Sequence, residues 1–246
     1  MRFYPINLNL QDKKVLIAGA GRVALRKFSR LLQTGALIKV VAPEFNQGFR
    51  PYLKQESKQY DFLERKFQDE DLIGQFLVFA ATDNSELNER IALLARGKNI
   101  LVNIIDSAQL SDFTVPAAVN RGELLLTVST GSNLPALSKK IRKKLESDFG
   151  LEFAFLLDIM SEKRSEIIEN IEDAELRKSI FSKIAADTFL NKIREIIVDF
   201  NPEILSDNNH QVDNLEYLAV KKEIKNAISE LVEREKIQKE GFGGEI

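Results

Sequence analysis

A glycine-rich turn near the N-terminus constrains the fold of this chain more than any other feature. Residues 14–18 (KVLIA) form the short apolar run expected of a strand that is buried on both faces. Gly19-Ala20-Gly21-Arg22-Val23-Ala24 follows, and residues 22–34 then carry apolar side chains at helical spacing. Residues 37–41 (LIKVV) predict a second strand. This order of strand, glycine turn, helix and strand predicts a βαβ unit.

The glycine turn is a G-x-G-x-x-A variant of the dinucleotide-binding fingerprint. Gly19 permits the tight turn, Gly21 lets backbone N–H groups approach a pyrophosphate, and the small Ala24 lets the helix pack close to the sheet. A turn that only reverses the chain is the alternative, but the flanking strand and helix favour a nucleotide site. The second strand lacks, at its end, the acidic residue that usually binds the ribose 2′-hydroxyl in NAD sites. Glu44 lies slightly late for this role, and its alternative role is to begin the next helix, where an acid suits the helix dipole. Since no arginine directly follows the strand to hold a 2′-phosphate, NAD is favoured over NADP.

Strands and helices continue to alternate up to Asp106. Strands are expected at 61–65, 76–81 and 100–105, and helices at 44–58 and 84–96. The order predicts an α/β domain, in which a Rossmann-like parallel sheet is covered on both faces. Asp106 follows the last of these strands, at the sheet edge where such folds bind ligands. It is either a general acid or base, or a residue that caps the following turn.

The pattern changes after residue 112, and we expect three domains. We expect residues 1–112 to form the Rossmann-like domain, 113–150 a small β/α region for dimerisation and substrate contact, and 151–246 a helical domain. In the middle region, short strands are expected at 113–115 and 124–128. A helix follows from Pro135, because proline is favoured in a first helical turn.

The formal net charge of −2 conceals an uneven distribution. Residues 1–150 hold 22 Lys and Arg against 16 Asp and Glu, whereas residues 151–246 hold 13 against 21. Arg22, Arg26 and Arg30 recur every four residues and share a helix face. A second basic cluster lies at 139–144. Each cluster is either a solvated helix face or a surface that binds a polyanion. A pI near 5.7 argues against general affinity for nucleic acid.

Composition excludes several classes of site. The chain has no cysteine and a single histidine, His210, which excludes disulfides, thiol nucleophiles and cysteine-based or multi-histidine metal sites. No apolar run approaches the ~20 residues of a membrane span, and the first residues lack the pattern of a signal peptide. We therefore expect a cytoplasmic protein that does not associate with membranes.

Several ordered segments resemble the family of precorrin-2 dehydrogenases, a module also found at the N-terminus of siroheme synthases. The matching text includes FYPINLNLQDKKVLIAGAGRVALRK, DLIGQFLVFAATDNSELNERI, ILVNIIDSAQLSDFTVPAAVNRGELLLTVSTG and PALSKKIRKKLE. Together these segments cover most of residues 3–148, and they are far more specific than the glycine turn alone.

The resemblance implies NAD-dependent dehydrogenation of precorrin-2 to sirohydrochlorin, in some members with insertion of Fe²⁺ into the product, and a homodimer. It implies that Asp106 serves in dehydrogenation and, where present, in chelation. Precorrin-2 carries eight carboxylates, which the basic helix faces are suited to bind. The implied cofactor contacts are Gly19, Ala20, Gly21, Arg22, Val23, Pro43, Glu44 and Thr82, and the implied substrate contacts are Ser129, Thr130, Gly131, Lys139 and Arg142.

One loop departs from the family pattern. The family text S-T-G-G-x-S-P is replaced by Ser129-Thr130-Gly131-Ser132-Asn133-Leu134-Pro135, which lacks the second glycine. This change makes chelation the less secure of the two activities. A non-catalytic NAD-binding sensor, in which the helical part passes cofactor occupancy to a partner, is the alternative function.

Overall fold

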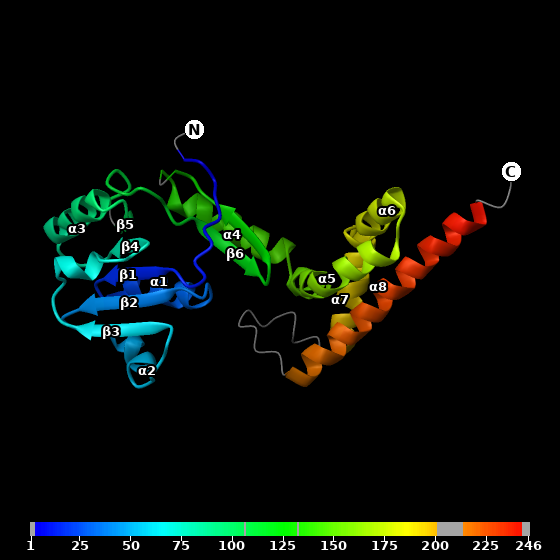
Figure 1. Ribbon diagram of the computed structural model, residues 1–246, viewed down its shortest axis with the longest axis horizontal. Coiled ribbons are helices and arrows are strands. Elements are labelled where there is room, and N and C mark those ends of the chain that lie inside the picture. Colours follow the sequence, from blue (N-terminus) through cyan, green and yellow to red (C-terminus); the bar gives the residue numbers. More distant parts are fainter. Residues whose placement is uncertain (1–2, 106, 132, 201–213, 243–246) are drawn as a thin grey trace. The chain divides into compact units, whose positions relative to one another are not determined.

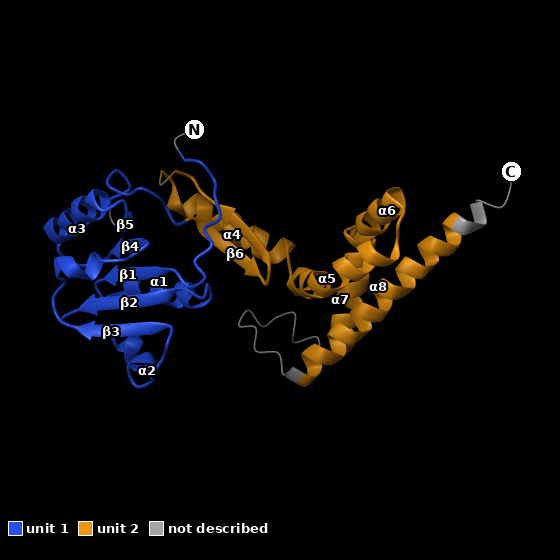
Figure 2. Ribbon diagram, viewed as in Figure 1, with its two compact units in different colours: residues 1–115 blue, residues 116–246 orange. Residues whose placement is uncertain are grey.

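The computed structural model describes residues 3–105, 107–131, 133–200 and 214–242. They form two compact units, Met1–Val115 and Pro116–Ile246 (Figure 2). The first predicted domain boundary, after residue 112, lies three residues before the end of the first unit. The separation of 113–150 from 151–246 stays a prediction, since both fall almost entirely within the second unit.

The first unit contains a parallel sheet of five strands in the order β3-β2-β1-β4-β5 (Figure 1). Ala18, the last residue of β1, lies opposite Val41 in β2 and Ala80 in β4. The strand order therefore changes direction beside the glycine turn, which is where such sheets bind ligands. The strands are β1 (Lys14–Ala18), β2 (Leu37–Ala42), β3 (Tyr60–Glu64), β4 (Leu77–Ala80) and β5 (Leu101–Ile104).

Two apolar layers cover this sheet, as the uninterrupted apolar runs predict. Val15 and Ile17 pack with α1 (Arg22–Leu32) on one face, and Leu16 and Ala18 pack with α3 (Ser85–Gly97) on the other. Side chains alternate along a strand, so a strand buried on both faces must be apolar throughout. The predicted Rossmann-like fold is confirmed.

The predicted helix at 44–58 is wrong. The structure has only a 3₁₀ turn, η1 (Gln47–Phe49), and a four-residue helix, α2 (Arg50–Leu53). The Asn46 side chain caps this turn by accepting a 3.0 Å hydrogen bond from the N–H of Gly48. Aromatic packing then determines the path of the segment, since rings from it and from β3 surround Phe28 of α1. These rings are Phe49, Tyr52, Tyr60 and Phe62, and Phe45 packs in turn against Phe49.

The predicted strand at 113–115 is also wrong. The backbone carbonyl of Phe113 instead accepts a 2.8 Å hydrogen bond from the side chain of Asn103 in β5. The strand begins later, as β6 (Ala117–Arg121), and pairs antiparallel with β7 (Leu124–Val128). Gly122, at φ +62°, lies in the turn between them, a conformation that favours glycine.

The second unit continues into helices, as predicted (Figure 1). Helix α4 (Pro135–Asp148) packs against the β6–β7 hairpin. The four helices that follow enclose an apolar core that includes Ile159, Ile180, Ile193 and Ile224. Among the described residues, no helix combines the length and apolarity that crossing a membrane requires. The four helices are α5 (Leu151–Asn170), α6 (Ala174–Ile184), α7 (Asp187–Phe200) and α8 (Asn214–Phe242).

Candidate functional site

Gly19 makes the tight turn after β1 in a conformation that excludes other residues. Its φ is +107°, and a Cβ atom there would lie 2.6 Å from the carbonyl carbon of Ala81. The backbone N–H of Gly19 donates a 2.8 Å hydrogen bond to the carbonyl of Val41. The turn is therefore packed between the ends of β2 and β4, where a side chain has no space.

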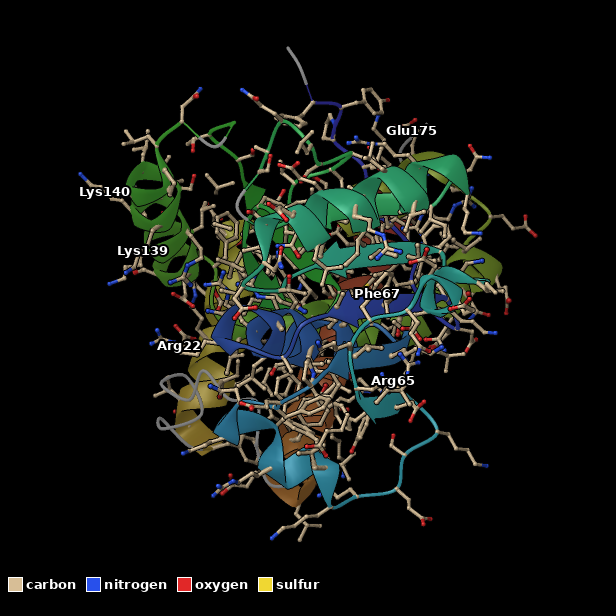
Figure 3. All side chains as sticks on the ribbon, turned by 90° about the vertical axis from the view of Figure 1, so that its left-hand side faces the viewer. Arg22, Arg65, Phe67, Lys139, Lys140 and Glu175 are labelled. Carbon is tan, nitrogen blue, oxygen red and sulfur yellow. The ribbon has the colours of Figure 1, made fainter. Side chains whose placement is uncertain are left out.

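Gly21 faces open space at the start of α1. It is the N-cap residue, with φ −76°, and no atom lies within 4 Å of the position that its Cβ would take. The first turn of α1 carries no acidic residue, and Arg22 projects outward from it (Figure 3). The first N–H groups of a helix have no partner within the helix and attract anions. This open, positive cradle fits the pyrophosphate of a dinucleotide.

The loop after β2 is tied to the same turn. The N–H of Asn46 donates a 3.0 Å hydrogen bond to the carbonyl of Ala20. Pro43 and Glu44 are both exposed, and they lie in the loop between the end of β2 and Asn46. The predicted cofactor contacts Gly19–Val23, Pro43 and Glu44 therefore share one edge of the sheet.

Thr82 completes this edge after β4, and it is held by a residue that the sequence did not reveal. Asn88 in α3 is buried, at 5% exposure. Its Oδ1 accepts hydrogen bonds from the Thr82 hydroxyl at 2.7 Å and the Thr82 N–H at 3.2 Å, and its Nδ2 donates to the Thr82 carbonyl at 3.0 Å. The sequence does place Asn88 on the apolar face of a predicted helix. This position could have indicated a structural role, because a buried amide needs hydrogen-bond partners.

The N-terminus of α3, which follows Thr82, is capped by a side chain. Its N-cap is Asn84, whose side chain accepts a 2.9 Å hydrogen bond from the N–H of Leu87. Asp83 is exposed beside it.

Asp106, the predicted acid, lies outside the described residues. The chain on either side of it is attached to the sheet. The N–H of Ile105 donates to the carbonyl of Ala80 at 3.2 Å. The hydroxyl of the buried Ser111 lies 2.9 Å from the N–H of Ile104 and donates to the carbonyl of Ser107 at 2.7 Å. The role of Asp106 stays a prediction.

The predicted substrate loop of the second unit is joined to α4. The Thr130 hydroxyl lies 2.8 Å from that of Ser138, which is buried in α4, and 3.2 Å from the carbonyl of Leu134. Gly131 has φ +61°, and its N–H donates a 3.3 Å hydrogen bond to the Ser129 hydroxyl. Ser132 lies outside the described residues.

The basic cluster on α4 has free and paired members. Lys139 and Lys140 are exposed and project outward (Figure 3). Arg142 is half-buried and forms a 2.8 Å ion pair with Glu146, one turn further along α4. Of the two predicted substrate contacts on this helix, Lys139 is therefore more available to an external anion than Arg142. Both assignments stay predictions.

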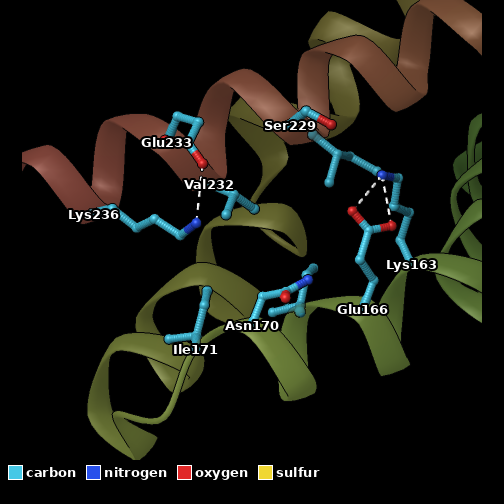
Figure 4. Close-up of a pocket in the computed structure, with 10 residues that line it drawn as sticks. Lys163, Glu166, Asn170, Ile171, Ser229, Val232, Glu233 and Lys236 are labelled. Atoms are coloured by element: carbon cyan, nitrogen blue, oxygen red, sulfur yellow. Dashed lines mark hydrogen bonds and ion pairs between the residues drawn. The ribbon is translucent and has the colours of Figure 1, made fainter.

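A cleft of about 180 Å³ in the second unit lies between α5 and α8 (Figure 4). Two internal ion pairs, Lys163–Glu166 at 2.8 Å and Lys236–Glu233 at 3.0 Å, line it. None of the predicted site residues lines this cleft, and each of its two lysines is paired with a glutamate of the same helix. Among the described residues, no group of three or more His, Asp or Glu side chains is arranged to hold a metal ion.

Comparison with known proteins agrees with the geometry of the first unit. Residues 6–117 match a family described as "Putative NAD(P)-binding". This match confirms the prediction of a nicotinamide dinucleotide as the cofactor.

Similar proteins extend the likeness into the second unit. Over 191 residues, the chain is 35% identical to a siroheme synthase of Psychromonas ingrahamii, covering 77% of this chain and 40% of that protein. Over 202 residues, it is 33% identical to a siroheme synthase of Pseudomonas paraeruginosa, covering 82% and 42%. The chain thus spans about 40% of the length of these relatives.

A solved structure shares the fold. "SirC, precorrin-2 dehydrogenase" superposes with a TM-score of 0.63 at 23% identity, covering 91% of this chain and 100% of that one. The predicted resemblance is confirmed by the sequence relatives together with this shared fold. The chain is thus similar in sequence to siroheme synthases, and it shares its fold with a precorrin-2 dehydrogenase.

Proposed function

We propose that this chain catalyses the NAD-dependent dehydrogenation of precorrin-2 to sirohydrochlorin. The single observation that carries the proposal is the cradle at Gly19 and Gly21, in a chain whose relatives are siroheme synthases. The cradle supports the cofactor, and the relatives support the tetrapyrrole substrate.

Different residues of the first unit are proposed to bind the cofactor and to accept the proton. The N-terminus of α1 binds the pyrophosphate, and Thr82, held by Asn88, supports the cofactor where β4 ends. When bound, NAD⁺ would supply the hydride acceptor, so that oxidation of precorrin-2 would give sirohydrochlorin, NADH and one proton. Asp106 is proposed to take that proton, since a single positioned carboxylate suffices as the base.

Selectivity for NAD is proposed to rest on Glu44. Its carboxylate is exposed just beyond the end of β2, the position that binds the ribose 2′-hydroxyl in NAD sites. A 2′-phosphate at the same place would meet a like charge. NADP is therefore expected to bind more weakly than NAD.

The second unit is proposed to contribute substrate contacts and a dimer interface. Ser129, Thr130, Gly131, Lys139 and Arg142 are the proposed contacts to the tetrapyrrole carboxylates. Exposed apolar residues on α4, Leu137 at 41% and Ile141 at 38%, support burial of this helix in a homodimer. A cytoplasmic location belongs to the same proposal, and cell fractionation tests it.

An anaerobic assay with precorrin-2 tests the activity. Purified protein with NAD is expected to form NADH and the sirohydrochlorin spectrum in equal amounts. Asp106→Asn is expected to abolish turnover while NAD binding persists. Asp83→Asn, which neutralises the exposed aspartate after β4, is the matched control and keeps its activity. No turnover by the wild-type protein would refute the proposal.

Insertion of Fe²⁺ into sirohydrochlorin is the second candidate activity, which the same family supports. The tetrapyrrole supplies four nitrogen ligands, so the chain needs no metal cluster of its own. Iron insertion that is no faster with the protein than without it would exclude chelation and leave the dehydrogenase intact. A non-catalytic NAD sensor predicts NAD binding without affinity for a tetrapyrrole, and a titration with sirohydrochlorin separates the two.

A further inference from the structure

Lys27 occupies an unusual position for a lysine. It lies on α1 between Arg26 and Arg30, which are exposed, but its own side chain is half-buried. The ammonium nitrogen is 5.1 Å from the ring centroid of Phe79, a buried residue of β4. Phe79 in turn packs edge-to-face against Phe113, with ring centroids 5.7 Å apart. The ammonium is therefore held over the β4 part of the sheet.

Lys27 has no counter-charge within the described part of the chain. No described carboxylate lies within 4.0 Å of its ammonium, and none of its described neighbours accepts a hydrogen bond from it. Burial, followed by the charges of Arg26 and Arg30, lowers the pKa of Lys27 to about 8. A partly buried ammonium normally has a carboxylate or carbonyl partner.

The elements packed against α1 supply no acid. On β1 and β2, the residues that face α1 are apolar, and Lys14 and Lys39 alternate toward the opposite layer. The charged groups that act on Lys27 are Arg26 and Arg30, both on α1 itself. Among the described residues, the strands packed against α1 present apolar side chains to Lys27 and its own helix adds two cations, which suits an anionic oxygen from outside.

The position on α1 distinguishes two sources of such an oxygen. A cofactor phosphate is expected at Gly21–Val23, at the start of the helix. Lys27 lies five residues beyond Arg22, about 7.5 Å along the helix axis at 1.5 Å per residue. It also faces β4, where the second half of a Rossmann sheet begins. This place suits a group beyond the pyrophosphate.

We propose that Lys27 is a substrate-binding residue and that its ammonium binds a carboxylate of the tetrapyrrole. Its half-buried position over Phe79, without a counter-charge, makes it ready to bind an anion. The proposal rests on the proposed function. Binding of the carboxylate supplies the missing counter-charge, so the complex holds the lysine fully protonated.

Calorimetric titration under anaerobic conditions tests this, with sirohydrochlorin and NAD as separate ligands. Lys27→Met keeps an unbranched chain over Phe79 but removes the charge, and Lys27→Arg restores it. Lys13→Met is the matched control, because the ammonium of Lys13 lies 5.7 Å from the ring of Phe76 at the opposite edge of the sheet. Thermal unfolding of each variant verifies that it is folded.

Lys27→Met is expected to weaken sirohydrochlorin binding about tenfold, the usual effect of losing a charge-assisted hydrogen bond. NAD affinity stays within twofold, Lys27→Arg recovers most of the loss, and Lys13→Met changes neither affinity. Wild-type protein at pH 8 is also expected to take up about half a proton when it binds sirohydrochlorin, whereas Lys27→Met takes up none. Titration in buffers of different ionisation enthalpy measures this proton uptake.

Two results overturn the assignment of Lys27 alone. One is unchanged sirohydrochlorin affinity and proton uptake in Lys27→Met. The other is a loss of NAD affinity with sirohydrochlorin binding intact, which identifies a phosphate contact instead. Failure of the wild-type protein to bind sirohydrochlorin overturns the proposed function as well as the role of Lys27.

Discussion

The carbonyl of Ala81 closes the space beside Gly19, with its carbon 2.6 Å from where a Cβ on Gly19 would lie. This contact joins the turn after β1 to the segment after β4, which carries Thr82. Because two loops of the candidate site meet at one glycine, a single methyl group disturbs both.

Gly19→Ala is expected to destabilise the protein by about 2–4 kcal/mol, since the new methyl group meets backbone and the φ of +107° is strained for alanine. Chemical denaturation measures this loss. A free energy of unfolding within 0.5 kcal/mol of the wild type would show that the two loops move apart readily.

Gly21→Ala separates binding from stability. Its φ is −76° and its surroundings are open, so alanine is expected to cost only about 0.5–1 kcal/mol of stability as an N-cap residue. The methyl group nevertheless fills the cradle, and NAD affinity is expected to fall at least about tenfold, or 1.4 kcal/mol. Calorimetry with NAD measures this. Wild-type affinity in this variant would place the pyrophosphate elsewhere.

Asn88→Ala is expected to lower the free energy of unfolding by about 2–3 kcal/mol, because it leaves the backbone N–H and carbonyl of Thr82 without the partners that Asn88 provides. The matched control is Ser85→Ala, an exposed position in the first turn of the same helix. Weaker NAD binding by Asn88→Ala, measured where both proteins are folded, indicates that Thr82 needs this support. Equal losses of unfolding free energy in Asn88→Ala and Ser85→Ala would contradict the conclusion that Asn88 supports Thr82.

Arg121→Met tests a second residue that the sequence did not reveal. Arg121 is 7% exposed and donates to the carbonyls of Phe149 and Glu146 at 3.0 and 3.1 Å, near the end of α4. Its loss leaves these carbonyls unpaired, and the expected cost is about 2–3 kcal/mol. Urea unfolding measures it. A change below 0.5 kcal/mol would mean that water replaces the guanidinium.

Acid sensitivity is expected in the second unit at Glu162. Ion pairs to Lys221 and then Lys225 of α8 lower the pKa of Glu162 from 4.5 to about 2. A carboxylate with a lowered pKa stabilises the fold above its unfolded pKa, so this contribution is present above pH 4.5 and lost as the pH falls toward 2. Unfolding by urea across that range measures the slope.

Lys221→Met is expected to flatten this pH dependence. Lys192→Met, which removes a longer 3.5 Å pair with Glu230, is expected to leave it unchanged. The same slope in all three proteins would exclude Glu162 as the titrating group.

The parts of the fold with strong local patterns were predictable from the sequence. The apolar run before Gly19 and the helical spacing after Gly21 located β1 and α1, because both signals are local. The segment 44–58 was not predictable, since its path depends on aromatic rings from β3 that pack around Phe28.

The candidate site shows the same division. The glycine turn could be found from its motif, whereas Asn88 acts through Thr82, a partner that is placed beside it only in the folded chain. Sequence spacing does not report such contacts. Lys27 could be seen as one of several basic residues, but its burial over Phe79 required the structure.

The segment that follows β5 also determines where the sheet ends. Asp112 pairs with Val102 through its backbone N–H at 2.9 Å and its carboxylate at 3.0 Å, and Ser111 bonds to Ile104. An exposed strand edge invites another chain to add a strand and aggregate. Here the chain occupies part of the outer edge of β5 itself, so strand addition there requires this segment to detach first. Protection against aggregation and the attachment of Ser111 and Asp112 to β5 therefore depend on the same few hydrogen bonds.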